Sequence, residues 1–300
     1  MKFKIMQYKF SILFYFVCSI TFLALPQLKS IDIEKNSSSE IRTINSIMEA
    51  KEFLDKISPN ALVVFDIGET LTVQKNNLLR IIRNQRIFNN KDIHTKDIVI
   101  TKFMQHDRNA KSTILSNMLV NSPLNFVEPA TKTILQNLKE RKIKAIAHCS
   151  SKANGLGAIK SRKEWRQAAL KKLGIDFSSS FEQTEISLFN VPDAKGFHPL
   201  FYKGILFGSP KGKALSAFLD QVKFTPSEIV CFDDCEEFIK RYAAEFKRRN
   251  INFTGFIYKA ALNPAPKLNS QIVDVQVEYM KKKQFIDDVK AAKIIKRRNR

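Results

Sequence analysis

The chain has 300 residues, 44% of them apolar, and carries 50 lysine and arginine residues against 29 aspartate and glutamate residues, a formal net charge of +21. This length and apolar content suffice for one large α/β domain with an insertion, and no repeat or low-complexity segment is present. The charge favours anionic partners, either small phosphorylated molecules or polyanionic surfaces such as membrane or nucleic acid, although lysine-rich genomes also encode basic proteins without such a role.

Residues 1–30 are predicted to be a secretory signal peptide. Lys2, Lys4 and Lys9 accompany an apolar run from Phe10 to Leu25, which is shorter than the roughly 20 residues that a membrane-spanning helix needs. Because no small-x-small cleavage motif ends this run, an uncleaved membrane anchor is the alternative. The protein is therefore expected to be exported, either periplasmic or secreted.

The folded part is predicted to begin after a polar, serine-rich linker over residues 31–45. Ser46–Glu49 has the pattern of a capping box, and apolar residues then recur at helical spacing. The core domain is expected to comprise residues 46–75 and 125–279.

The first predicted strand is Ala61–Phe65, a run of apolar residues typical of a fully buried strand in a parallel sheet. Asp66 follows its carboxyl end. Because ligands bind outside the carboxyl ends of the strands in open α/β sheets, Asp66 is a candidate site residue. An aspartate in this place can also simply cap the next turn.

Residues 76–124 are predicted to form a helical insertion, because the interval between the first two strands is far longer than a crossover helix requires. The second strand, Lys142–His148, follows a helix that begins near Pro129 and leads into the polar run Cys149–Ser151. A capping box at Ser161–Glu164 then starts another helix.

Two strand-like runs, Glu185–Phe189 and Leu200–Phe207, are predicted to form a hairpin-like excursion. The next helix is expected to open with Ser209-Pro210, with serine as its cap. Lys211 would then lie on the first turn, where backbone donors and the helix dipole attract anions. Lys213 is the competing choice.

A further apolar strand, Glu228–Asp233, ends in an acidic pair that Asp234 completes. A helix over Glu237–Arg249 and a strand over Ile251–Tyr258 follow. Residues 280–300 are predicted to form a basic amphipathic helix with Phe285, Val289, Ala292 and Ile295 on its apolar face. This helix either contacts an anionic membrane or nucleic acid or lies on the domain with its charges in water.

Cysteine usage favours neither a disulfide framework nor a zinc site. With Cys18 in the leader, an odd number of cysteines remains. Cys231 and Cys235 could join His148 and Cys149 around zinc, but their spacing straddles a strand end and an acidic turn, unlike the tight knuckles of structural zinc sites.

Together these motifs resemble those of the haloacid-dehalogenase-like superfamily of phosphotransferases, whose first apolar strand ends in Asp-x-Asp-x-Thr or Val. Asp66, Gly68 and Thr70 match that motif except for its second acid. The Cys149–Ser151 run, the lysine at the head of a helix and the acidic pair resemble the other three motifs. The run Phe-Tyr-Lys-Gly-Ile-Leu-Phe before the lysine is similar to a subgroup without an assigned function from bacteria that live inside host cells.

The resemblance implies a three-layer α/β/α domain with a parallel sheet, in which the helical insertion is a cap that selects the substrate. It also implies a Mg²⁺-dependent phosphatase or phosphotransferase that acts through an aspartyl-phosphate intermediate. Asp66 would be the nucleophile, and Ser150 and Lys211 would hold the phosphate. Cys149 or Ser151 would replace Ser150 if the strand register is shifted by one residue.

The resemblance further implies a Mg²⁺ site made by Asp66, the Gly68 carbonyl and Asp234, with Asp233 or Glu237 as a further ligand. A hard cation with oxygen ligands and retained waters fits this set. A true dehalogenase is the least favoured reading, because those enzymes need no metal whereas the pair Asp233-Asp234 points to one.

The departure from the family pattern is Gly68, where the usual acid protonates the leaving oxygen in a role worth roughly 10²- to 10⁴-fold. The neighbouring Glu69 is expected to point elsewhere. Some similar members without the acid remain active, which leaves two hypotheses. The first is an exported phosphatase acting on a small phosphorylated substrate, and the second is a catalytically inactive relative that binds a host or envelope partner.

Overall fold

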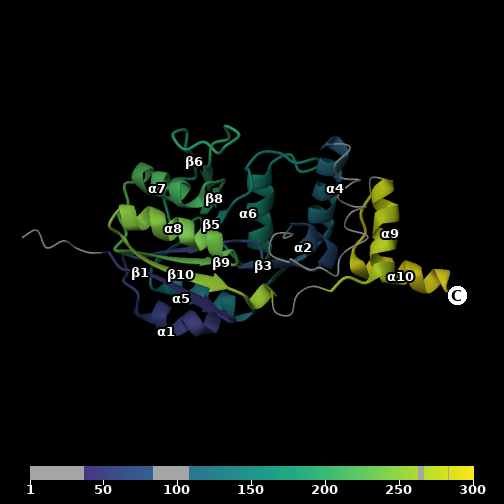
Figure 1. Ribbon diagram of the computed structural model, residues 1–300, viewed down its shortest axis with the longest axis horizontal. Coiled ribbons are helices and arrows are strands. Elements are labelled where there is room, and N and C mark those ends of the chain that lie inside the picture. The colour runs from purple at the N-terminus through teal and green to yellow at the C-terminus, as the bar shows by residue number, and fades with distance from the viewer. Residues whose placement is uncertain (1–36, 84–107, 263–266, 283) are drawn as a thin grey trace, which may run out of the picture. The chain divides into compact units, whose positions relative to one another are not determined.

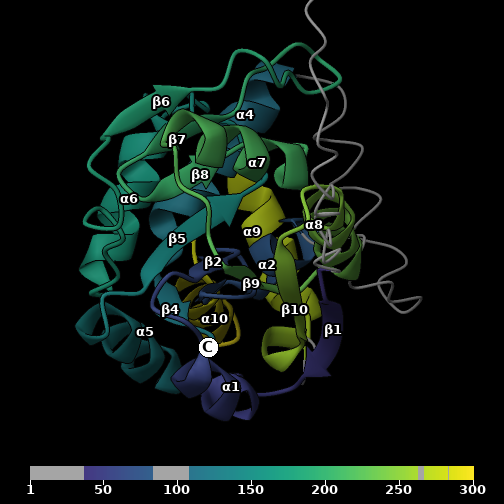
Figure 2. The ribbon, with the colours of Figure 1, turned by 90° about the vertical axis from the view of Figure 1, so that its left-hand side faces the viewer.

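The computed structural model describes residues 37–83, 108–262, 267–282 and 284–300, and its main element is a mixed sheet of eight strands (Figure 1). The strand order is β1-β10-β9-β2-β5-β8-β7-β6, in which the first six strands are mutually parallel (Figure 2). β7 runs antiparallel to β8, and β6 runs antiparallel to β7. These strands are β1 (Ser39–Ile44), β2 (Leu62–Phe65), β5 (Lys144–Cys149), β6 (Glu185–Ser187), β7 (Leu200–Tyr202), β8 (Ile205–Phe207), β9 (Glu228–Asp233) and β10 (Asn252–Tyr258). The predicted α/β class with a mostly parallel sheet is therefore confirmed.

Helices cover both faces of this sheet (Figure 1). They are α1 (Lys51–Lys56), α5 (Ala130–Glu140), α6 (Arg162–Lys172), α7 (Lys211–Gln221) and α8 (Glu236–Arg248). Val63 and Phe65 of β2 belong to a core shared with α1, α5 and α6, whereas Leu62 and Val64 belong to one shared with α7 and α8. Successive side chains of a strand point to opposite faces, which explains why β2 is apolar throughout.

Both predicted capping boxes lie where a helix begins. The Ser46 hydroxyl accepts a hydrogen bond from the Met48 N–H at 3.2 Å and the Glu49 carboxylate accepts one from the Ser46 N–H at 2.9 Å, before a 3₁₀ turn (Ile47–Ala50) that leads into α1. At α6 the Ser161 hydroxyl accepts from the Glu164 N–H at 3.4 Å. Such caps satisfy backbone donors that a helix start leaves free.

The prediction of a linker up to residue 45 is wrong for residues 39–44, which form β1. This strand pairs in parallel with β10 at the edge of the sheet, and five of its six residues are exposed. An edge strand whose side chains mostly face water lacks the apolar run by which buried strands are recognised.

The predicted single strand Leu200–Phe207 is in fact two strands. Lys203 and Gly204 form the turn between β7 and β8, with φ of 46° and 82°. Positive φ at both central residues is what a tight type I′ hairpin turn requires. Because lysine rarely adopts a positive φ, Lys203 in the first of these positions did not mark the turn in the sequence.

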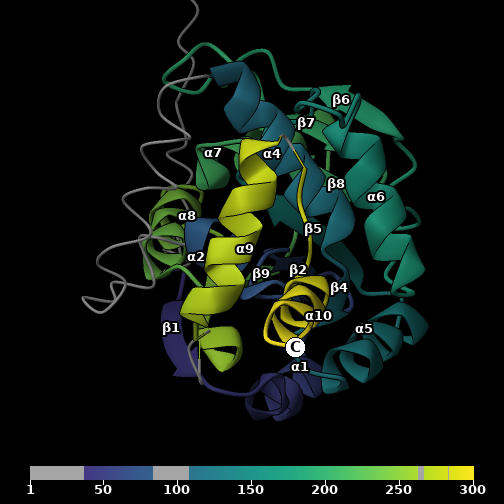
Figure 3. The same cartoon turned by 90° about the vertical axis from the view of Figure 1, so that its right-hand side faces the viewer.

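The predicted insertion leaves and rejoins the domain through a ribbon of β3 (Thr72–Gln74) and β4 (Leu124–Phe126), which pair antiparallel. Its described helices are α2 (Asn77–Arg83) and α4 (Arg108–Asn121), and α9 (Ser270–Lys281) lies beside them (Figure 3). Together these three helices enclose a small apolar core that Trp165 of α6 also contacts. The insertion thus shares its core with a C-terminal helix that was predicted to belong to the main domain.

The single basic helix predicted for residues 280–300 is replaced by the end of α9 and by α10 (Asp288–Arg298). Asp287 starts α10, because its carboxylate accepts a hydrogen bond from the Lys290 N–H at 2.7 Å. The new helix start shifts the apolar face: Ala291 is buried against α9, whereas Val289 is 64% exposed. Of the two alternatives left open for this segment, α10 does lie on the rest of the chain through Ala291, and contact with an anionic membrane or nucleic acid stays a prediction.

The predicted signal peptide over residues 1–30 and part of the insertion lie outside the described residues. Across the ranges that the structure describes, no helix combines the length and the apolar character needed to cross a membrane.

Candidate functional site

The carboxyl ends of neighbouring parallel strands bring predicted site residues together. Phe65 of β2 lies in register between Ala147 of β5 and Phe232 of β9. Asp66 continues this ladder, with its N–H donating to the Phe232 carbonyl at 2.8 Å. Asp66 and Asp233 therefore leave adjacent strands at the same level of the sheet.

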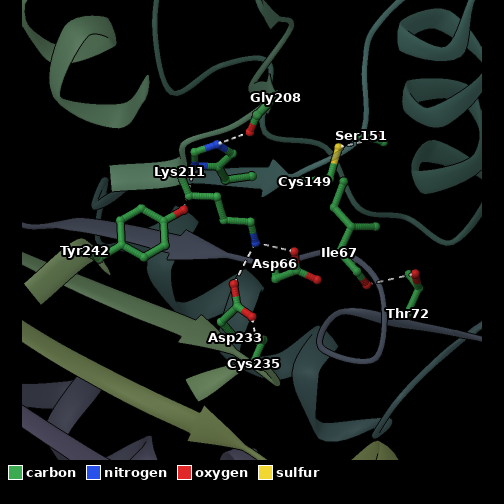
Figure 4. Close-up of polar contacts among 11 residues, drawn as sticks. Asp66, Ile67, Thr72, Cys149, Ser151, Gly208, Lys211, Asp233, Cys235 and Tyr242 are labelled. Carbon is green, nitrogen blue, oxygen red and sulfur yellow. Dashed lines mark hydrogen bonds and ion pairs between the residues drawn. The ribbon is translucent and has the colours of Figure 1, made fainter. Parts of the chain in front are cut away.

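Lys211 joins these two aspartates (Figure 4). Its Nζ donates to Oδ1 of Asp66 at 2.5 Å and to Oδ2 of Asp233 at 2.6 Å. The Lys211 side chain is completely buried, whereas Lys213 is exposed, so the structure selects the first of the two candidate lysines. The bond to Asp233 was not predicted from the sequence.

The start of α7 explains how a lysine reaches this position. The helix begins at Lys211 after Pro210, which occupies the cap position, so the prediction that Ser209 caps it is wrong. A Cβ on the next residue, Gly212, would lie 2.8 Å from the Arg241 carbonyl of α8. Glycine there allows α7 to approach α8 closely, which holds the lysine against the sheet edge.

The candidate site holds more carboxylates than cations. Burial raises the pKa of Asp233 to about 6, although Lys211 opposes the shift. Burial by itself would lower the pKa of Lys211, but Asp233 and Asp66 outweigh it and raise that pKa. Burial, and then the charges of Asp66 and Asp233, also raise the pKa of Asp234 well above its ordinary value.

Asp234 carries the clearest sign of a missing partner. Its side chain is 5% exposed, and among the described residues nothing donates a hydrogen bond to its Oδ2 atom. Its backbone carbonyl accepts from the Lys259 ammonium at 2.7 Å. A buried carboxylate oxygen without a donor is costly, so an added cation at this point would relieve both the repulsion and the lost hydration.

A divalent cation fits this donor set. The buried carboxylates of Asp233 and Asp234 and the partly buried one of Asp66 lie around one ammonium group, and both oxygens of Asp233 already accept hydrogen bonds. In the described ranges no three histidine, cysteine or acidic side chains are arranged as a ready-made metal cluster. Asp66 and Asp234 would therefore need help from the Gly68 carbonyl and from water, a mixture that suits Mg²⁺.

The second motif ends on an exposed serine. Ser150 follows β5 at the same sheet edge and is exposed, while Cys149 is buried with its thiol 3.2 Å from the Ser151 hydroxyl (Figure 4). Of the three candidates, Ser150 is the one that the register leaves open to a ligand. No contact joins it to Asp66 within the described residues.

The one glutamate in the loop after Asp66 is paired with an arginine of the insertion. Glu69 has a left-handed φ of 62°, and its buried carboxylate accepts from Arg80 of α2 at 2.8 Å. Arg80 also donates to the Ala261 carbonyl at 2.5 Å. No local sequence pattern predicts this pair, which connects the insertion to the loop after Asp66.

A neutral histidine lies behind the site. His148 of β5 accepts a hydrogen bond from the Tyr242 hydroxyl at 2.6 Å through Nδ1, and its Nε2 donates to the Gly208 carbonyl at 3.3 Å. Complete burial and the nearby charge of Lys211 lower the pKa of His148 well below its ordinary value. The ring therefore links β5, β8 and α8 as a structural bridge.

Comparisons with known proteins name a family but no activity. Residues 40–292 match the model of a family described as "Protein of unknown function (DUF2608)". A Chlamydia trachomatis (serovar D) protein described as "Putative outer membrane protein" is 30% identical over 105 residues, which cover 34% of this chain and 39% of that protein. The chain thus matches well under two thirds of that relative's length. No solved structure gives a significant match.

Proposed function

Because the chain belongs to the DUF2608 family, whose description names no activity, we propose a function from its own residues: a Mg²⁺-dependent phosphatase or phosphotransferase of the haloacid-dehalogenase-like type. Its substrate would be a small phosphorylated molecule. The observation that carries the proposal is the buried Asp66–Lys211–Asp233 contact at the carboxyl edge of the parallel sheet. The order of the four sequence motifs supports it.

In this proposal Asp66 is the nucleophile. Lys211 occupies its Oδ1, and in the described part of the chain Oδ2 accepts no hydrogen bond, so this second oxygen is left to attack phosphorus. A new bond forms between Oδ2 and phosphorus while the bond from phosphorus to the ester oxygen breaks, and the leaving group departs with that electron pair. Water then hydrolyses the aspartyl-phosphate and releases phosphate.

The other residues hold charge. Lys211 orients the Asp66 carboxylate through its hydrogen bond to Oδ1, and Ser150 would donate its hydroxyl to a phosphoryl oxygen. Asp66, the Gly68 carbonyl and Asp234 would hold Mg²⁺, which would neutralise the repulsion between the carboxylate and the phosphate. Asp233 would fix the lysine, because both its oxygens are committed to protein donors.

The test is turnover of an aryl phosphate by the purified protein, with Mg²⁺ and with EDTA. We expect phosphate release only with Mg²⁺. An Asp234→Asn variant should release no phosphate, and added Mg²⁺ should not restore the activity. Asp55→Asn, which changes an exposed acid on α1, is the matched control and should behave as the wild type. A wild-type protein that binds Mg²⁺ without any turnover would instead support the inactive relative that binds a partner.

A second prediction concerns Gly68. Without an acid at this position the leaving oxygen has no proton donor, so the rate should depend steeply on leaving-group acidity, and aryl or acyl phosphates should react far faster than alkyl phosphates. Gly68→Asp should speed the alkyl phosphates by up to roughly 10²-fold. The left-handed residue of the loop is Glu69 and not Gly68, so the backbone can accept this side chain without a left-handed φ.

The measurement is a series of phosphate monoesters of graded leaving-group acidity, assayed with both proteins. A flat dependence in the wild type would mean that another group already supplies the proton. That result would remove this explanation of Gly68.

An exported location is part of the proposal. It is supported by the charged start and apolar run of residues 1–30 and by the name of the chlamydial relative, which describes that protein as an outer membrane protein.

A further inference from the structure

A cavity of about 450 Å³ lies at the end of β5 that is remote from the candidate site. Lys144, the first residue of β5, lines it, whereas Cys149 at the other end of the strand lies beside the site. At roughly 3.3 Å per residue these two ends are about 16 Å apart. The cavity is therefore separate from the proposed phosphatase centre.

The cavity lies between α5, the start of β5 and the segment 174–180 that follows α6. This segment is fixed to the strand, because the Ser180 hydroxyl donates to the Ala145 carbonyl at 2.5 Å and accepts from the Ala145 N–H at 3.3 Å. Phe177 stacks on Phe65 with ring centroids 6.3 Å apart. These contacts make the walls part of the folded core, so the cavity is preformed.

Its charged lining is almost entirely cationic. Three lysines, Lys132, Lys139 and Lys142, face a single acid, Asp176, whose charge is already met by Lys171 at 3.3 Å and by the Ser178 N–H at 3.0 Å. The fourth lysine of the lining, Lys144, donates its ammonium group to the Ser180 carbonyl at 2.8 Å and lies over the Phe181 ring. Within the described residues, none of the first three lysines lies within ion-pairing distance of a carboxylate. Unpaired cations around a concave site attract an anion.

The remainder of the lining is largely apolar: Phe126, Leu135, Ile143, Ala145, Ile175 and Phe177. The volume lies within the range of sites for small organic molecules. A simple inorganic anion would leave this apolar surface unused, whereas an anion with an apolar body would cover it. The combination therefore selects an amphipathic ligand.

Helix stability alone does not account for these lysines. Lys139 lies in the last turn of α5 and Lys142 follows its end, where cations stabilise the helix dipole without any ligand. Lys132 lies in the first turn of that helix, where a cation is unfavourable. Lys142 also has a left-handed φ of 57°, which favours glycine.

We propose that this cavity binds a small organic anion, with its acidic group among Lys132, Lys139 and Lys142 and its aromatic or aliphatic body against Leu135, Ile143 and Phe177. The site is independent of the proposed phosphatase activity. It requires only the part of the chain around α5, β5 and α6.

The test is a fluorescence titration of the full-length protein with anilinonaphthalene sulfonate, an aromatic anion, and with phenylnaphthylamine, a related neutral probe. The double variant Lys139→Gln/Lys142→Gln should bind the sulfonate about 3- to 10-fold more weakly and the neutral probe unchanged. Added salt should weaken only the sulfonate. Lys172→Gln, an exposed lysine of α6 outside the cavity, is the matched control.

Two further readings locate the probe and exclude a folding defect. Hydrogen exchange of residues 174–180 should slow when the sulfonate binds. Lys142→Gly should weaken sulfonate binding while keeping an equal or higher melting temperature, because glycine accepts the left-handed backbone. Equal sulfonate affinity in the wild type and the double variant, or unchanged exchange in 174–180, would overturn the proposal.

Discussion

Replacing Asp66 with asparagine is expected to lower the rate of phosphate release from an aryl phosphate by roughly 10³-fold or more. The amide has nearly the shape of the carboxylate, and its oxygen can still accept the bond from Lys211. It is not a nucleophile, however, so no bond to phosphorus can form. The fold should remain intact, which thermal unfolding monitored by circular dichroism would check.

This prediction separates chemistry from assembly of the site. In the wild type, rapid acid quenching during turnover should leave a phosphoryl group on the peptide that contains Asp66, and mass spectrometry should find none in the variant. Asp55→Asn, which changes an exposed acid on α1, should behave as the wild type. Full activity in Asp66→Asn would remove this residue from the mechanism.

The largest expected effect on stability comes from Lys211→Met. Methionine preserves much of the volume of the side chain but leaves the buried carboxylate of Asp233 and the partly buried one of Asp66 without the ammonium group that they share. Removing one partner from such a buried ionic contact costs about 3–5 kcal/mol. The free energy of unfolding, measured by urea denaturation without metal, should fall by that amount.

The same helix provides the control. Lys213 lies two residues further along α7 and is exposed, so Lys213→Met should change the free energy of unfolding by no more than about 0.5 kcal/mol. Mg²⁺ should recover part of the loss in Lys211→Met, because a second source of positive charge would then reach the carboxylates. If the two variants were equally stable, the buried contact would not hold the site together.

The central part of the fold could be predicted because its strands are buried on both faces. The apolar residues of β2 and β9 leave little choice but a parallel sheet covered by helices, and the capping boxes at Ser46 and Ser161 mark helix starts by their own hydrogen bonds. The edges were harder to predict. β1 is polar because it faces water, and Lys203 adopts a conformation that its residue type disfavours.

The sequence pointed to the residues of the candidate site but not to the contacts among their side chains. Parallel strands deliver Asp66 and Asp233 to one edge by topology alone, so their proximity follows from the order of the motifs. The partner of each group depends on side-chain directions and on packing. Gly212 allows α7 to approach α8 closely, and Lys211 at the start of α7 contacts Asp233. Arg80, which pairs with Glu69, belongs to an insertion whose path no local sequence pattern predicts.

The pairing of β1 with β10 has a consequence for how the chain reaches its folded state. The Ser38 N–H donates a hydrogen bond to the side-chain oxygen of Asn252, which lies 214 positions later in the chain. β2 likewise pairs with β9, which is made much later. Contacts of such sequence separation form slowly, because a long loop must close before they stabilise anything. During synthesis β1 therefore remains without its partner until β10, which ends at Tyr258, has been made, whereas β2 can pair earlier with β5. The strand order that sets Asp66 beside Asp233 likewise delays assembly of the site until β9 has been made.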